Sequence, residues 1–119
     1  MVDTQKLKTI SYFVVSGWHK IERCYELIEE EKHTIAVAYL NQSSTLIQNA
    51  YSVYKQNFED GESQEFESFY AQFDIFNDEV LDSVATDHGD HYISIYFEEV
   101  KERYENLPTV FKTISDSNS

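Results

Sequence analysis

Apolar residues recur every three or four positions in four stretches of the chain, a spacing typical of helices that bury one face. The first two stripes are Leu7, Ile10, Val14, Ile21, Cys24 and Ile28, then Ala36, Tyr39, Leu40, Ser43, Leu46, Ile47, Ala50 and Tyr54. The last two are Phe66, Phe69, Phe73, Phe76, Val80 and Val84, then Ile93, Tyr96, Phe97, Val100, Tyr104 and Leu107. Four such helices with short links bury their stripes together in a bundle. The pattern therefore predicts an all-α protein, an antiparallel four-helix bundle made of two helical hairpins.

Two polar segments and one proline mark the expected boundaries. Residues 57–65, NFEDGESQE, contain the Asn, Asp, Gly and Ser of a loop, and Ser63 stands where a helix cap is expected. Residues 85–91, ATDHGDH, form a second break, and Pro108 should break or kink the last helix because it lacks an amide hydrogen. We expect one helical domain over residues 1–114 and a frayed tail over residues 115–119.

The first half leaves two alternatives open. The polar run Glu29 to His33 interrupts the stripe without glycine or proline, so residues 4–57 form either a hairpin, which we favour, or one helix of about 50 residues, roughly 80 Å long. Gly17 lies on the buried stripe, where glycine costs about 1 kcal/mol relative to alanine. It indicates either a close helix contact or a kink.

The net charge of -13 arises entirely in the second half of the chain. Residues 1–57 contain six Lys and Arg against six Asp and Glu, whereas residues 58–119 contain three against sixteen. This balance disfavours binding to nucleic acid or to an anionic membrane, which requires clustered cations. The 41% hydrophobic and 15% aromatic content nevertheless predicts a folded chain.

The acidic residues of the last two helices are the candidate binding surface. Asp74, Asp78 and Asp82 recur at every fourth position and should line one helix face, although like charges at this spacing repel. A solvated acidic face that aids solubility is the plain interpretation; a recognition face is the other. The candidate binding residues are Asp74, Asp78, Asp82, Glu98 and Glu102, together with the aromatic residues Tyr70, Tyr92 and Tyr96.

Metal chemistry has only weak candidates. Asp87, His88, Asp90 and His91 could share a divalent ion, but a loop that turns at Gly89 and caps the next helix explains the same residues. Glu30 and His33 form one Glu-x-x-His element, whereas a di-iron bundle needs two. The motifs Glu98-Glu99-x-x-Glu102 and Glu79-x-x-Asp82 resemble the magnesium motifs of all-α nucleotide pyrophosphohydrolases in reverse order. We predict no cofactor.

Nucleophilic catalysis is also disfavoured. Cys24 and His19 lie five positions apart in one helix and face different ways, so Cys24 is interpreted as a buried small residue. Trp18 is expected at a helix interface. A single cysteine, no membrane-length apolar stretch and no secretory signal predict a cytoplasmic protein. Because the sequence contains no catalytic signature, we predict that the protein is not an enzyme.

Two function classes remain. The first is a non-catalytic adaptor, chaperone or regulator that presents an acidic, aromatic-rich surface to a basic protein or peptide. Such a bundle is similar in outline to small export chaperones of the flagellin-binding kind. The second is a DNA mimic, an inhibitor whose carboxylates imitate phosphates and occupy a nuclease, repressor or restriction enzyme. We favour the first class, as a monomer or a homodimer.

Overall fold

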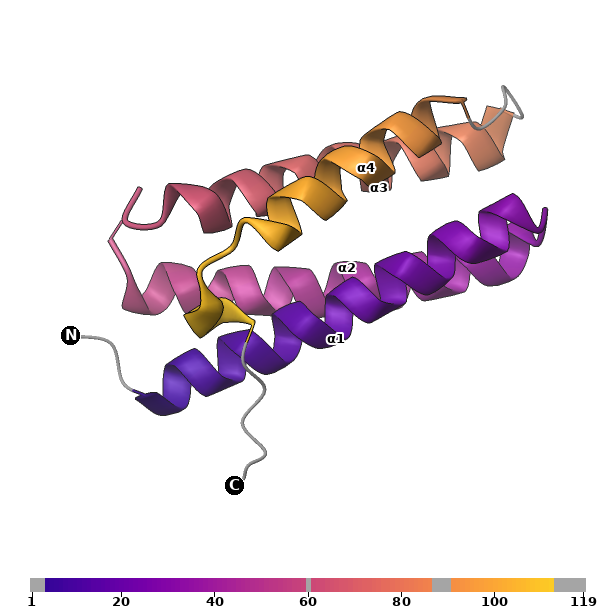
Figure 1. Cartoon of the computed structure of the whole chain (residues 1–119). Helices are drawn as coiled ribbons and strands as arrows, with labels where there is room; N and C mark the ends of the chain where they lie inside the picture. Colours follow the sequence, from indigo (N-terminus) through magenta and orange to yellow (C-terminus); the bar gives the residue numbers. More distant parts are fainter. Residues whose placement is uncertain (1–3, 60, 87–90, 113–119) are drawn as a thin grey trace.

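Four helices form two antiparallel hairpins in the computed structural model, which describes residues 4–59, 61–86 and 91–112 (Figure 1). The helices are α1 (Thr4–Glu29), α2 (His33–Asn57), α3 (Gln64–Thr86) and α4 (His91–Glu105), followed by the short 3₁₀ helix η1 (Thr109–Phe111). Helix α1 packs along α2, and α3 packs along α4. The predicted four-helix bundle is thereby confirmed, and no strand occurs in the described part of the chain.

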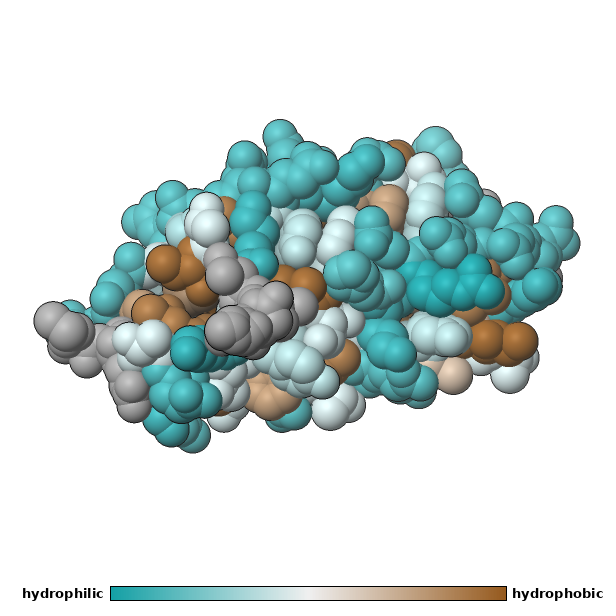
Figure 2. Space-filling model, turned by 60° about the horizontal axis from the view of Figure 1, so that its bottom comes forward, coloured by the Kyte–Doolittle hydropathy of each residue, from teal (hydrophilic) through white to brown (hydrophobic). Residues whose placement is uncertain are grey.

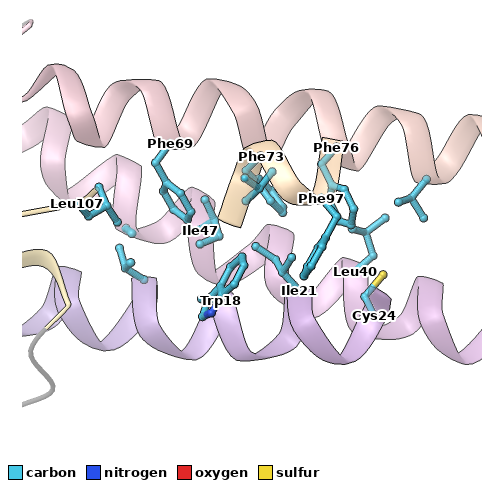
Figure 3. Packing of buried hydrophobic residues seen from close by; sticks show 14 of the residues in the cluster. Trp18, Ile21, Cys24, Leu40, Ile47, Phe69, Phe73, Phe76, Phe97 and Leu107 are labelled. Atoms are coloured by element: carbon cyan, nitrogen blue, oxygen red, sulfur yellow. The ribbon is translucent and has the colours of Figure 1, made fainter. Parts of the chain in front are cut away.

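The four apolar stripes meet between the two hairpins (Figure 3). Phe69, Phe73 and Phe76 of α3 point toward residues of the first hairpin, including Ile21 and Ile47. Trp18 is buried, with its ring centroid 4.7 Å from that of Tyr104 and 5.8 Å from that of Phe97. The prediction that Trp18 packs at a helix interface is therefore confirmed, and aromatic stacking couples α1 to α4.

The turn between α1 and α2 confirms the hairpin and excludes a single long helix. The N–H of Lys32 donates to the carbonyl of Leu27 at 2.8 Å, and the N–H of Glu31 donates to the carbonyl of Ile28 at 2.9 Å. This pair of bonds is the Schellman arrangement that ends helices, usually with glycine at the left-handed position. Here Glu31 occupies that position with φ of 62°.

Gly17 is the point of close contact between α1 and α2. A Cβ atom at this position would lie 2.6 Å from Cδ1 and 2.9 Å from Cγ1 of Ile47, which is itself buried. The close-contact alternative is thereby confirmed: only the absence of a side chain lets Ile47 pack against the α1 backbone.

The link between α2 and α3 is held by a buried tyrosine. The hydroxyl of Tyr54 accepts a hydrogen bond from the N–H of Ser63 at 2.8 Å and donates one to Oε2 of Glu67 at 2.9 Å. Oε2 of Glu67 also accepts from the N–H of Gly61 at 2.8 Å. Ser63 caps α3 as predicted, because its Oγ accepts from the N–H of Phe66 at 3.3 Å.

The last helix ends before the proline. Helix α4 stops at Glu105, and Pro108 adopts an extended conformation with φ of -56° and ψ of 144° before η1 begins. Nζ of Lys112 donates to the carbonyl of Glu105 at 3.0 Å, which satisfies one of the free carbonyls at this helix end. Phe111 is buried, so η1 extends the core beyond α4. The predicted tail, residues 115–119, lies outside the described residues.

Candidate functional site: the outer face of the second hairpin

The predicted acidic residues lie on the side of α3 and α4 that faces away from the first hairpin. Asp74, Asp78 and Asp82 of α3 are exposed, and so are Glu98 and Glu102 of α4. Positions four apart share a helix face, and the buried stripes of these two helices fix that face as the solvent side. The carboxylates of both helices therefore belong to one outer surface of the hairpin.

Arg103 neutralises only part of this negative charge. Its Nη1 lies 3.2 Å from Oε1 of Glu102, and its Nη2 lies 3.5 Å from Oε1 of Glu99. Its Nε donates to Oγ of Ser68 at 2.9 Å, which connects α4 to α3. Within the ranges that the structure describes, Asp74, Asp78 and Glu98 take part in no ion pair. Their negative charge therefore faces solvent without an ion-pair partner among these residues.

The surface also contains apolar side chains. Tyr92 is 54% exposed and its ring centroid lies 6.3 Å from that of Tyr96, which is partly buried. Ile95 is 41% exposed and lines a hollow of about 350 Å³ on α4 together with Ser94, Glu98, Glu99 and Glu102. Three carboxylates and an aliphatic wall thus border one depression. Ile95 was not predicted from the sequence; its signal there is an isoleucine outside the buried stripe, on an otherwise polar helix face.

Tyr70 does not belong to this surface. Its ring stacks on that of Tyr51 of α2, with centroids 4.0 Å apart, and it is partly buried. Burial and the nearby Asp74 raise the pKa of its hydroxyl. The structure therefore places Tyr92 and Tyr96 together and Tyr70 at the α2 side of α3.

Most aromatic residues serve the core. Only Tyr12 and Tyr92 have an exposed side chain, whereas the other aromatic residues are buried or partly buried. Figure 2 shows one face of the molecule on which hydrophilic residues predominate and hydrophobic residues form small patches. The aromatic richness of the sequence is thus mainly a packing feature, and the aromatic part of the outer surface is confined to α4.

The described residues that were candidates for catalysis or metal binding are not arranged as such a site. Cys24 is fully buried, and burial raises the pKa of its thiol to about 12, which disfavours the reactive thiolate. His19 is exposed. Among the side chains that can be placed, no group of three or more His, Cys, Asp or Glu residues is arranged to hold a metal ion. Asp87, His88 and Asp90 lie outside the described residues, and His91 is exposed at the start of α4.

Comparisons with protein-family models, with curated proteins and with solved structures found no match to this chain. Among the described helices, none combines the length and the hydropathy needed to cross a bilayer.

Proposed function

We propose that this protein is a non-catalytic interaction module whose second hairpin binds a basic protein or peptide. The supporting observation is the contrast in charge between the hairpins: α3 and α4 contain ten Asp and Glu against two Lys and Arg, whereas α1 and α2 contain three against five. Self-repulsion on α3 costs stability, so a surface of this kind is better explained by a partner that neutralises it.

Charge reversal on α3 tests this proposal. We expect Asp74→Lys combined with Asp78→Lys to abolish capture of the partner from an extract of the source organism, with the helical circular dichroism unchanged. The matched control is Glu26→Lys combined with Glu29→Lys, which changes the net charge equally on exposed positions of α1. The control should keep its partner. Equal loss in both variants would mean that overall charge, and not this surface, governs capture.

A second candidate, a DNA mimic, is favoured by one observation. Asp74, Asp78 and Asp82 place three exposed carboxylates on successive turns of α3, a regular row of negative charge. Salt dependence distinguishes the candidates: a mimic that binds through charge alone should lose affinity steeply between about 50 and 200 mM salt. A module that also buries apolar surface should change little over the same range.

A further inference from the structure

Three apolar side chains of α4 form a short strip on the outer face of the second hairpin. Tyr92, Ile95 and Tyr96 stand at positions i, i+3 and i+4, which are neighbours on a helix surface. The ring contact between Tyr92 and Tyr96 and the exposure of Tyr92 and Ile95 agree with this placement. An exposed group of this kind among carboxylates differs from isolated surface residues and points to a contact surface.

The strip continues onto α3. The hydrogen bond between Arg103 and Ser68 fixes the register of the two antiparallel helices. Ile75 follows Ser68 by seven residues, close to two helical turns, so it lies on the same side of α3. Tyr96 precedes Arg103 by the same number of residues and lies on the same side of α4. Because the helices are antiparallel, Ile75 and Tyr96 lie at the same level. Ile75 is 45% exposed. We call Ile75, Tyr92, Ile95 and Tyr96 the seam strip: Ile75 and Tyr96 lie level with each other on α3 and α4, and Tyr92 and Ile95 extend this group along the outer side of α4.

Carboxylates border the seam strip. Glu98, Glu99 and Glu102 surround the hollow that Ile95 lines, and Asp78 and Asp82 are exposed on the α3 turns that follow Ile75. An aliphatic wall with a carboxylate rim matches the side chain of Lys or Arg, whose methylene groups pack on apolar surface while the cationic head stays at the edge. The surface thus suits a ligand that is apolar along its middle and basic at its sides.

We propose that the seam strip receives an amphipathic helix of a partner protein, with its apolar face on Ile75, Tyr92 and Ile95 and its Lys and Arg side chains on the carboxylates. An apolar strip bordered by carboxylates can take the apolar face of a helix, as in the helix-in-groove mode of recognition, and charge complementarity selects a basic helix. This inference rests on the proposed function and names the class of partner: a helix that presents both features on one side.

A pair of synthetic peptides tests the inference. The probe is a fluorescent 18-residue peptide of Leu and Lys with all leucines on one helical face; the reference has the same composition in an order without an apolar face. In anisotropy titrations at about 150 mM salt, the amphipathic peptide should bind this protein at least about tenfold more tightly than the reference. Equal affinities would overturn the inference.

Matched variants locate the binding surface. Tyr92→Ser combined with Ile95→Ser should weaken binding of the amphipathic peptide about tenfold. Tyr12→Ser combined with Ile35→Ser removes side chains that are 55% and 51% exposed on the first hairpin, and should leave the affinity unchanged. Circular dichroism checks that both variants fold. Equal weakening in the two variants would overturn the seam strip as the site.

The two proposals fail separately. If the peptides bind equally while Asp74→Lys with Asp78→Lys still abolishes capture of the partner, the helix inference fails and the acidic interaction module stands. If capture survives that double reversal, the proposed function fails whatever the peptides do.

Discussion

The two hairpins of this bundle have a similar fold and different surfaces. The first hairpin has nearly balanced charge, a tight turn at Glu31 and a backbone contact at Gly17 that brings α1 and α2 close together. The second has a large excess of carboxylates, and its two helices are connected through Arg103 and Ser68. The first hairpin is arranged for close packing, while the second tolerates repulsion on its outer face.

This difference distinguishes the residues that stabilise the fold from those on the outer surface of the second hairpin. Repulsion between the carboxylates of the second hairpin lowers the free energy of unfolding, and burial of the core between the hairpins must offset this loss. Inner residues such as Trp18 and Phe73 bury large apolar surface, which stabilises the fold without using the outer side of α3 or α4. The outer side of α3 and α4 is therefore not needed to form the core. Four substitutions test how far the hairpins differ, from the largest expected effect to the smallest.

Gly17→Ala should break the close packing of the first hairpin. The added methyl group would lie 2.6 Å from Cδ1 of the buried Ile47, so we expect the free energy of unfolding to fall by about 2 kcal/mol despite the better helix propensity of alanine. Urea denaturation measures the change. Adding Ile47→Val, which removes Cδ1, should recover part of the loss, and Ser16→Ala should cost little. A stabilised Gly17→Ala variant would contradict the close contact.

Tyr54→Phe should weaken the connection between the hairpins. Without the hydroxyl, the N–H of the buried Ser63 loses its acceptor and Glu67 loses a donor, so we expect a loss of about 1 to 2 kcal/mol by urea denaturation. Tyr12→Phe removes an exposed hydroxyl and is the matched control, with no expected effect. Equal stability of the two variants would show that the Tyr54 hydrogen bonds contribute nothing.

The same tyrosine predicts a dependence on alkaline pH. Burial raises the pKa of Tyr54 from 10.0 to about 12, so the unfolded chain releases this proton before the folded chain does. The stability that the shift contributes is complete below pH 10 and is lost as the pH rises toward 12. Thermal denaturation over this range should show a smaller decline for Tyr54→Phe than for the unmodified protein.

Glu31→Gly should stabilise the turn of the first hairpin. A glutamate in the left-handed region costs about 1 kcal/mol that glycine avoids, so this variant should gain about that amount in thermal denaturation. Lys32→Gly changes a neighbouring turn residue whose φ of -101° is ordinary, and it should give no such gain. A loss in Glu31→Gly would mean that the side chain has a role in the turn.

Asp78→Asn should relieve repulsion on the second hairpin. It removes two like-charge pairs, with Asp74 and with Asp82, and should raise the free energy of unfolding by about half a kcal/mol at low salt. The gain should disappear at high salt because the charges are exposed. Glu26→Gln on the first hairpin should instead cost a little, since it removes the ion pair with Arg23. Equal effects of the two changes would remove the electrostatic difference between the hairpins.

The helices and the buried stripes could be predicted because both follow from periodicity within a segment. Ile10, Phe73 and Val100 are buried as their spacing requires. The end of α1 was harder to place, because Glu31 takes the left-handed position in which glycine is the usual signal. Nothing in the composition of the polar run distinguishes this turn from a continuous helix.

Contacts between helices could not be predicted, because periodicity indicates on which face of its helix a residue lies but not which residue of another helix it contacts. The stacking of Tyr70 on Tyr51 and the bond from Arg103 to Ser68 depend on how the helices are placed relative to one another. Asp74, Asp78 and Asp82 were predicted to line one face of their helix, and all three are exposed, whereas the exposed Ile75 and Ile95 were not identified. Single apolar residues outside a stripe are common, so neither isoleucine stands out in the sequence.

The position of Trp18 gives this molecule a built-in optical reporter. It is the only tryptophan, it belongs to the first hairpin, and it stacks on two rings of α4 from the second. Its emission will therefore shift to longer wavelength when the hairpins separate and water reaches the indole. A ligand that settles on the outside of α3 and α4 leaves that spectrum unchanged, whereas one that enters between the hairpins alters it, so one fluorescence scan distinguishes docking from insertion.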